Sequence, residues 1–277
     1  MESKPDKQGH LAVLAADRRG HAAAAELERR GVPVRVADAG SEAEIRAALL
    51  QAEAVLGPVR APAGMLRHLE VLPHGTPLFV GLVDAALRAA AAGQGFPLRS
   101  YTDDEAFAIA NAVPTAEGAI AEASRLSGET MHGAHVAVLG FGRCGRALAE
   151  RLIAWHAQVT VAARRAEQLA AAQAMGARAV PWSQRAMEAQ FVFNTVPAPA
   201  LGSEELTRLH RGTWILDLAS EPGGVDRAAA EACGLNARLL PSLPGRLFPE
   251  TAGRIVAETI LPWLPPVLRG GKARCDR

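Results

Sequence analysis

The sequence predicts an α/β protein built from two doubly wound domains with parallel sheets. Short apolar segments alternate with alanine-rich helical segments along most of the chain, and this alternation is typical of βαβ units. Residues 135–148, HVAVLGFGRCGRAL, combine a buried strand, a glycine turn and the start of a helix, which favours a Rossmann domain in the second half. The 277 residues are sufficient for two modest domains.

Four apolar runs in the first half are expected to be strands, at residues 11–16, 32–38, 52–57 and 77–82. The alanine-rich segments beside them favour helices at residues 21–31, 42–51 and 83–93, and Gly31 is a typical helix stop. These elements predict a flavodoxin-like or Rossmann-like domain over residues 1–112, which we expect to bind the substrate.

A connecting helix is expected over residues 113–130. Pro114 suits the first helical position, Glu117 suits the first turn, where the helix dipole favours an acid, and Gly128 is a stop signal. A long helix between two βαβ sets is a natural connector between domains.

The second half repeats the alternation and predicts a Rossmann domain over residues 131–245. Its strands are expected at residues 135–140, 158–164, 177–181, 190–196, 213–219 and 237–241. Its helices are expected at residues 143–155, 166–176, 203–210 and 226–233. Residues 249–264 predict a closing helix within a C-terminal segment of residues 246–277.

The composition excludes several classes of function. Hydrophobic residues make up 49% of the chain and charged residues 21%, as in ordinary globular proteins, and the net charge of +1 gives no basis for binding nucleic acid or a membrane surface. Cys144, Cys233 and Cys275 are too few and too widely spaced for a disulfide framework or a metal site. Because the polar N-terminus does not resemble a signal peptide, we expect a cytoplasmic protein.

Gly140, Gly142 and Gly145 form the Gly-x-Gly-x-x-Gly pattern after a strand and before a helix. The first glycine permits a tight turn, the second lets the backbone approach a pyrophosphate, and the third lets helix and strand pack closely. The N-terminus of the helix supplies N–H groups and partial positive charge. This pattern predicts a dinucleotide site, in which we interpret Cys144 as a small packing residue without a redox role.

The end of the next strand indicates which dinucleotide. NAD-binding domains place Asp or Glu about 20 residues after the turn, where it binds the ribose 2′-hydroxyl. Here Ala163, Arg164 and Arg165 occupy that place, and the next acid is Glu167. Guanidinium groups bind a 2′-phosphate that a carboxylate would repel, so we predict NADP(H). One of the two arginines is expected to be a solvated residue at the helix start.

Polar residues also end two later strands, at the edge where α/β sheets bind ligands. Asn194 and Thr195 are equally consistent with contact to the nicotinamide ribose and with ordinary turn chemistry. Asp217 is expected to be a structural acid, since an unpaired charge inside an apolar strand is costly. Ser220 and Glu221 are better candidates for the active cleft.

Several motifs, in this order, give the chain a resemblance to the A subunit of dipicolinate synthase over nearly its whole length. They are Asp17-x-Arg19, NAVPTAEG at 111–118, MHGAHVAVLGFGRCG at 131–145, AARR at 162–165, NTVP at 194–197, LDLASEPGG at 216–224 and LPGRLFPETAG at 243–253. The fold of that family is similar to those of the D-2-hydroxyacid and alanine dehydrogenases. Ala16 and Glu250 depart from the pattern, which has a glycine and a lysine there.

The resemblance implies an NADP-dependent oxidoreductase acting on a CH–CH bond. Members of the family convert dihydrodipicolinate, or the hydroxytetrahydro precursor from the lysine/diaminopimelate pathway, to the dipicolinic acid of bacterial endospores. The resemblance further implies a flavoprotein-like partner, the B subunit of dipicolinate synthase, and a location in the mother cell of a sporulating bacterium. Which substrate form is used, the oligomeric state, and whether the B subunit takes part in the chemistry are left open by the sequence.

For this reaction the protein must align two rings, hold two carboxylates and accept a proton. The expected catalytic residues are Glu117 as a base, which is equally consistent with an ordinary acid of the first helical turn, Ser220 and Asn111. The expected substrate-binding residues are Arg19, Thr115, Glu221, Gly245 and Arg246. The expected cofactor-binding residues are Gly140, Gly142, Arg143, Cys144, Gly145, Ala163, Arg164, Arg165, Asn194, Thr195, Val196 and Pro197.

Two commoner dehydrogenase activities fit the sequence less well. A 2-hydroxyacid dehydrogenase needs an arginine where Ser220 stands and a late histidine, whereas the last histidine is His210. A shikimate-dehydrogenase-like enzyme needs a lysine in the first domain, but none lies between Lys7 and Lys272. An NADP(H)-binding scaffold or regulatory subunit for a flavoprotein partner, or another NADP-dependent oxidoreductase, is the remaining alternative.

Overall fold

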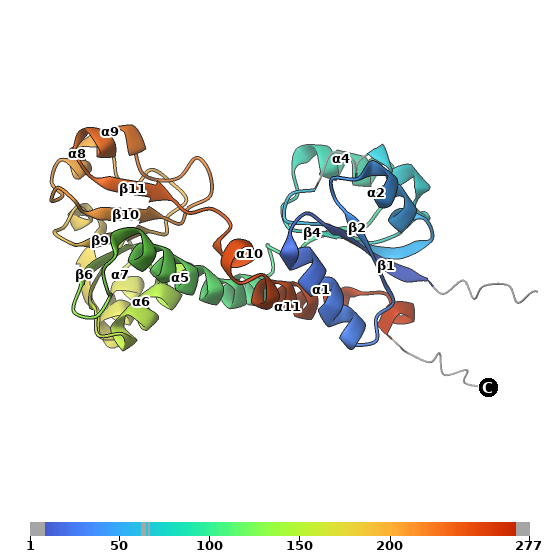
Figure 1. The fold of residues 1–277 in the computed structure, drawn as a ribbon, viewed down its shortest axis with the longest axis horizontal. Helices are drawn as coiled ribbons and strands as arrows, with labels where there is room; N and C mark the ends of the chain where they lie inside the picture. Colours follow the sequence, from blue (N-terminus) through green and yellow to red (C-terminus); the bar gives the residue numbers. More distant parts are fainter. Residues whose placement is uncertain (1–8, 62–64, 66, 270–277) are drawn as a thin grey trace, which may run out of the picture. The chain divides into compact units, whose positions relative to one another are not determined.

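The computed structural model describes residues 9–61, 65 and 67–269, which form two compact units (Figure 1). The first unit contains the described residues of 1–111 and 248–277, and the second contains residues 112–247. Residues 248–269 of the C-terminal segment therefore pack with the N-terminal elements, whereas residues 246–247 belong to the second unit. Cys275 lies outside the described residues.

The first unit has a five-stranded parallel sheet with the order β2-β1-β3-β4-β5. The strands are β1 (His10–Ala15), β2 (Val34–Asp38), β3 (Ala52–Leu56), β4 (Leu78–Val80) and β5 (Leu98–Ser100). The order reverses between β1 and β3, as in flavodoxin-like sheets. Sequence reasoning missed β5, because three residues with an arginine at the centre give no apolar run.

Helices cover both faces of this sheet. They are α1 (Arg18–Arg29), α2 (Glu42–Leu49), α4 (Ala85–Gly93) and α11 (Pro249–Ile260), with short 3-10 segments at Leu69–Val71, Leu261–Trp263 and Pro266–Arg269. Leu11 and Val13 of β1 belong to the core under α1 and α11, whereas Ala12 and Leu14 belong to the core on the opposite face. This alternation produces the double winding that the sequence predicted.

Helix α11 lies beside α1 (Figure 1). A Cβ at Gly253 would be 2.6 Å from the Ala22 Cβ and 2.7 Å from the Arg19 carbonyl oxygen. Because only glycine fits this contact, Gly253 of the final motif has a packing role that fixes the C-terminal helix on the first unit.

Helix α5 corrects the expected connector. It runs over Glu105–Ser127, with Pro114 inside it, whereas we expected it to begin at Pro114. Asp104 accepts a hydrogen bond from the Phe107 N–H at 3.0 Å and caps the true start. The prediction failed because we weighted the proline, which lacks only its own N–H, above the capping aspartate.

The second unit has a six-stranded parallel sheet with the order β11-β10-β9-β6-β7-β8. The strands are β6 (His135–Leu139), β7 (Gln158–Ala163), β8 (Arg178–Pro181), β9 (Phe191–Asn194), β10 (Trp214–Asp217) and β11 (Asn236–Leu239). The helices are α6 (Arg143–Ala154), α7 (Ala166–Ala174), α8 (Ser203–Leu206), α9 (Arg227–Ala232) and α10 (Leu243–Leu247), with a 3-10 turn at Trp182–Gln184. This is the Rossmann order, with its reversal between β6 and β9.

The predicted fold class is therefore confirmed, and the order of predicted elements is correct apart from β5, the start of α5 and the short helix α10. Pro244 and Gly245 lie in α10, where the sequence predicted no helix. No helix in the described part of the chain is long and apolar enough to cross a membrane.

Candidate functional site

Three strands of the second unit end together at the carboxyl edge of its sheet. Leu139 of β6 pairs with Asn194 of β9, and Asn194 pairs with Asp217 of β10. The segments that follow these strands therefore meet at the point where the strand order reverses. Ligands of open α/β sheets bind at such a point.

The glycine turn after β6 is fixed by close contacts at its first and third positions. Gly140 has φ +92°, and a Cβ there would be 2.8 Å from the Thr195 Oγ1. A Cβ at Gly145 would overlap the Gly140 carbonyl oxygen. A Cβ at Gly142 would have no neighbour within 4 Å. Gly142 thus leaves open space beside the N-terminus of α6, where the backbone approach of a pyrophosphate requires it.

The N-terminus of α6 is suited to an anion. Gly142 is the capping position and offers no side-chain hydrogen bond, and the first turn of α6 contains no acidic residue. The first N–H groups and the helix dipole therefore favour a phosphate. Arg143 is exposed in this turn, and burial raises the pKa of the Cys144 thiol, which keeps it protonated as a packing residue would be.

Thr195 holds the turn from the neighbouring strand. Its N–H and its hydroxyl donate hydrogen bonds to the Leu139 carbonyl oxygen, at 3.0 Å and 2.9 Å. The hydroxyl hydrogen is thus used inside the protein, and only the oxygen lone pairs of Thr195 remain for a ligand donor. Val196 is half-buried and Pro197 is exposed, so this segment contributes its backbone to the edge.

Asn194 and Asp217 form a buried pair. The Asn194 Nδ2 donates to the Asp217 Oδ1 at 2.8 Å and to the Val196 carbonyl oxygen at 3.2 Å. Asp217 also accepts from the N–H groups of Ala219, Gly224 and Val225. Asp217 is the structural acid that we expected. Asn194 is 0% exposed and its side chain bonds within the protein, which favours the turn interpretation over contact with the nicotinamide ribose.

The motif after β10 wraps around this pair. A Cβ at Gly223, which has φ +92°, would be 2.6 Å from the Asp217 Oδ2, and one at Gly224 would be 2.6 Å from the Asn194 Nδ2. Both glycines are therefore required by the close approach of the loop. Ser220 and Glu221 of the same loop are exposed and remain accessible at the edge.

The end of β7 carries no carboxylate. Ala163 is buried, Arg164 and Arg165 are exposed, and the Arg165 Nε lies 3.2 Å from the Glu167 Oε1. The Arg164 guanidinium lies 6.0 Å from the centre of the Trp182 ring. Two guanidinium groups thus stand where an NAD-binding domain has its acid.

The three candidate residues on α5 do not form one group. Asn111 and Thr115 are four residues apart and lie on one side of the helix, whereas Glu117 is rotated by roughly 200° from Thr115. The Glu117 Oε1 accepts from the Arg151 Nε at 3.1 Å. Arg151 belongs to the last turn of α6, about 13 Å along that helix from Gly142. Glu117, the expected base, therefore pairs with Arg151 and lies on a different side of α5 from Asn111 and Thr115.

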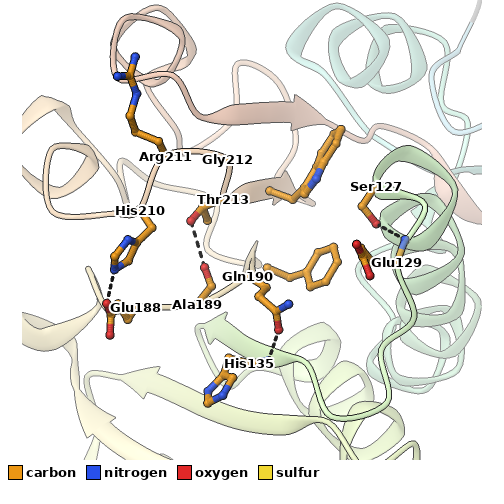
Figure 2. A pocket seen from close by; sticks show the side chains of 12 residues that line it. Ser127, Glu129, His135, Glu188, Ala189, Gln190, His210, Arg211, Gly212 and Thr213 are labelled. Atoms are coloured by element: carbon orange, nitrogen blue, oxygen red, sulfur yellow. Dashed lines mark hydrogen bonds and ion pairs between the residues drawn. The ribbon is translucent and has the colours of Figure 1, made fainter.

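A hollow of about 490 Å³ lies at the opposite, amino edge of the sheet (Figure 2). It is lined by the first residues of β6, β9 and β10 and by two connecting segments, among them His135, Gln190, His210 and Thr213. The five residues of β6 separate the hollow from the glycine turn by about 16 Å along the strand. The hollow is distinct from the candidate cofactor site, and sequence reasoning missed it because separate segments line it.

The comparisons with known proteins agree with this geometry. Residues 108–223 match the family model for the NAD binding domain of D-isomer specific 2-hydroxyacid dehydrogenases. The dipicolinate synthase A subunit of Bacillus subtilis (strain 168) is 37% identical over 198 residues, which cover 70% of this chain and 66% of that relative. The chain belongs to the dipicolinate synthase A-subunit family.

Solved structures of this family support the assignment. The A subunit from Bacillus halodurans has a TM-score of 0.82 at 28% identity, covering 93% of this chain and 98% of that one. The corresponding structure from Bacillus subtilis has a TM-score of 0.80 at 29% identity, covering 94% of this chain and 97% of that one.

More distant structures show the same fold. L-alanine dehydrogenase has a TM-score of 0.64 at 16% identity, covering 83% of this chain and 74% of that one. D-lactate dehydrogenase from Escherichia coli has a TM-score of 0.66 at 16% identity, covering 91% and 94%. At 16% identity these two structures show the fold alone. The family model and the A-subunit relatives assign the chain to the dehydrogenase-type oxidoreductases, with a nicotinamide dinucleotide as cofactor.

The family motifs outside the glycine turn make specific contacts. The Arg246 Nη2 donates to the Glu122 Oε1 at 2.8 Å, and Arg125 donates to the other oxygen of this buried carboxylate. Arg246, which we expected to bind substrate, thus ties α10 to α5. Gly245, next to it in α10, is half-buried.

The first turn and the final motif are near one another within the first unit. The Arg19 Nη2 donates to the Asp17 Oδ2 at 2.7 Å, and Asp17 also caps α1 by accepting from the Arg19 N–H. The Arg18 Nη2 lies 3.9 Å from the Glu250 Oε1, and both side chains are mostly exposed. Glu250, where the family pattern has a lysine, is therefore at the surface beside a cation.

Proposed function

We propose that the chain is an NADP-dependent dehydrogenase that converts dihydrodipicolinate, or its hydroxytetrahydro precursor, to dipicolinate. Membership in the A-subunit family supports the substrate, since the relatives described above are dipicolinate synthases. The observation that carries the cofactor choice is the acid-free end of β7, where Arg164 and Arg165 are exposed. Guanidinium groups bind a 2′-phosphate through charge and paired N–H donors.

We assign the following roles in cofactor binding, substrate binding and proton transfer to residues of the chain. The N–H groups at the start of α6 would hold the pyrophosphate, and one of Arg164 and Arg165 would hold the 2′-phosphate, while the other is the solvated residue expected at the helix start. A nicotinamide held at this edge would supply the hydride-accepting chemistry that oxidation of the substrate ring requires. Ser220 and Glu221, exposed on the loop after β10, contact the substrate, and the Glu221 carboxylate accepts the ring proton. Asn111 and Thr115, on one side of α5, help to orient the ring.

The proposed partner and cellular role rest on the resemblance to the A-subunit family. Because the Bacillus subtilis relative is one named subunit of a synthase, we propose that the chain works with a second one, the flavoprotein-like B subunit. The product would supply the dipicolinic acid of endospores, in the mother cell of a sporulating bacterium.

The cofactor preference can be tested with purified protein and both dinucleotides. Wild type should oxidise the diaminopimelate-pathway substrate with NADP⁺ in preference to NAD⁺, followed by the ultraviolet absorbance of dipicolinate. Replacing Arg164 and Arg165 together by Ser should raise the KM for NADP⁺ about 10- to 100-fold and leave that for NAD⁺ nearly unchanged. Arg178→Ser, an exposed arginine at the start of β8, is the matched control. Tighter binding of NAD⁺ than NADP⁺ by wild type would refute the preference.

The proposed base can be tested with two glutamates. Glu221→Gln should lower kcat about 10²-fold or more without changing NADP(H) affinity, because it removes the proton acceptor. Glu117→Gln should leave kcat unchanged and cost at most about 1 kcal/mol of stability, since its exposed pairing with Arg151 is a surface ion pair. Equal losses of kcat in both variants would contradict this assignment.

A scaffold without activity of its own is a second candidate. It is favoured by the internal bonding of Asn194 and Glu117, which removes two expected side chains from the site. Assays of the chain alone and with its partner protein separate the two. Dipicolinate formed by the chain alone supports the enzyme, and NADP(H) binding with formation only by the partner supports the scaffold.

A further inference from the structure

The first unit has its own ligand-binding geometry, which the proposed cofactor site does not use. Its strand order reverses between β1 and β3, so the segments after these strands diverge at the carboxyl edge. In open α/β sheets, such a reversal creates a crevice where ligands bind. The segment after β1 contains Asp17 and Arg19, the first motif of the family pattern.

A small cavity lies at this reversal. Asp17, Arg19 and Tyr101 line it together with apolar residues, including Leu56 and Val256. Its volume is about 20 Å³, which is enough for roughly one water molecule. The cavity can therefore admit one small polar group of a ligand, while the rest of the ligand stays outside.

Arg19 is held in place at this cavity. Its side chain is only 14% exposed, and its Nη2 donates to the Asp17 Oδ2 at 2.7 Å. That bond uses one of the five N–H donors of a guanidinium group. Asp17 thereby fixes the direction of Arg19 and leaves donors for a further acceptor. The neighbouring Arg18 is 80% exposed and has no comparable anchoring.

Tyr101 supplies a second donor. It is the single tyrosine of the sequence and is 2% exposed, with its ring 5.3 Å from that of Phe107. Its hydroxyl makes no hydrogen bond to any residue in the described part of the chain, and Tyr101 is one of the residues that line the cavity. Burial raises the pKa of the Tyr101 hydroxyl well above its usual value, against the opposing effect of Arg19, so the group stays a protonated donor.

A hydroxyl that has no partner in the protein is free to donate to a ligand acceptor. A guanidinium and a phenol that face one cavity suit a carboxylate, which accepts at both oxygens. Asp17 opposes an isolated anion, because its own carboxylate lines the same cavity. It favours an anion whose neighbouring atom carries an N–H, since the Asp17 oxygens can accept from that hydrogen.

We propose that Asp17, Arg19 and Tyr101 bind one carboxylate of the substrate together with the adjacent ring nitrogen, which carries an N–H in its amine form or its protonated imine form. The ligand class is an α-amino or α-imino carboxylate. Tyr101 and Arg19 donate to the carboxylate, and Asp17 accepts from the nitrogen. The identity of the natural ligand rests on the proposed function, whereas the chemistry of the cavity does not.

The single tyrosine permits a direct binding test. Full-length protein labelled with 3-fluorotyrosine has one ¹⁹F resonance, which reports on residue 101 alone. Piperidine-2,6-dicarboxylate should shift that resonance in a saturable way. Cyclohexane-1,3-dicarboxylate, which lacks the nitrogen, should bind about tenfold more weakly, and piperidine-2,6-dicarboxamide, which lacks the carboxylates, should give no shift. Equal shifts with the dicarboxylate and the diamide, or no shift with any of the three, would overturn the proposal.

Variants provide the kinetic test. Tyr101→Phe keeps the ring and removes the hydroxyl, so KM for the substrate should rise about tenfold while kcat changes less than twofold. Arg19→Gln should raise KM by more, and Arg18→Gln is the exposed control that should leave KM unchanged. NADP(H) affinity should be the same in all three. An unchanged KM in Tyr101→Phe would contradict the assignment of this residue.

The two proposals fail in different ways. If wild type forms dipicolinate but the fluorine resonance ignores all three ligands, the cavity proposal is wrong and the function stands. If wild type forms no dipicolinate but the resonance responds selectively to piperidine-2,6-dicarboxylate, the substrate assignment is wrong and the cavity proposal stands. If neither is seen, both are wrong.

Discussion

In both units the strand order of the parallel sheet reverses once, but the turns that follow β6 and β1 at these reversals differ. After β6, Gly142 caps α6 without a side-chain bond and leaves open space. After β1, Asp17 caps α1 through its carboxylate, and Gly20 packs against Ala15. The N-terminus of α6 therefore keeps its N–H groups available for a phosphate. At the N-terminus of α1, the Asp17 carboxylate already accepts a backbone N–H and supplies the negative charge.

This difference shows that sheet topology determines which edge of the sheet can bind a ligand, whereas the residues of the turn determine which ligand binds there. The open helix end suits a large anion that lies along the backbone. The closed helix end leaves only side chains, Arg19 and Tyr101, and these suit one small polar group. The chain thus has two edges with distinct chemistry, which substitutions at three places can test in order of their expected effect.

The largest effect is expected at the buried pair of the second unit. Asp217→Ala leaves the N–H groups of Ala219, Gly224 and Val225 and the Asn194 amide without their acceptor, so it should cost about 3 kcal/mol or more. Urea denaturation measures the change. Asp226→Ala, which removes only the exposed cap of α9, is the control and should cost about 1 kcal/mol. Equal losses would show that the buried pair does not organise this edge.

A smaller effect should separate two glycines of the open turn. Gly145→Ala places a Cβ against the Gly140 carbonyl oxygen, so it should cost about 1–3 kcal/mol and also abolish NADP(H) binding. Gly142→Ala has room, so it should keep the thermal midpoint and weaken only NADP(H) binding. Thermal denaturation and a fluorescence titration with NADPH distinguish them. Undiminished NADPH affinity in Gly142→Ala would mean that the open space is not the pyrophosphate position.

The smallest effect is expected at the closed turn. Asp17→Ala removes the cap of α1 and should cost about 1 kcal/mol. NADP(H) affinity should not change, because the cofactor edge belongs to the second unit. Denaturation and NADPH titration on the same sample measure both quantities. A loss of NADPH affinity as large as that in Gly142→Ala would remove the distinction between the two turns.

The sequence was informative wherever one local pattern has one physical cause. The glycine triad, the strand before it and the arginines after β7 all lie within a single βαβ unit, so their spacing predicted the turn. Membership in the A-subunit family was likewise visible from ordered motifs. Asp217 was predicted to be structural because an unpaired charge within an apolar strand is too costly to leave without partners.

The sequence did not indicate which polar side chains form hydrogen bonds or ion pairs with other residues of the protein. Asn194 looks like a ligand-facing residue until β10 places Asp217 beside it, and Glu117 looks like a base until α6 presents Arg151. Arg246 binds Glu122, which is 124 positions earlier in the chain. Such pairings depend on which helix and strand faces meet, and no local pattern encodes them.

By itself the sequence determined the two parallel sheets, the dinucleotide turn and the absence of an acid at the end of β7, because hydrophobic period and glycine spacing act over a few residues. Only the tertiary structure decided which polar groups remain free for a ligand. In the structure the Asp17 side chain caps α1, whereas Gly142 leaves the N-terminus of α6 without a side-chain cap. Tyr101, after β5, and Arg19, after β1, line the same cavity. Long-range packing sets these contacts, and burial then decides whether a donor bonds to the protein or to a ligand.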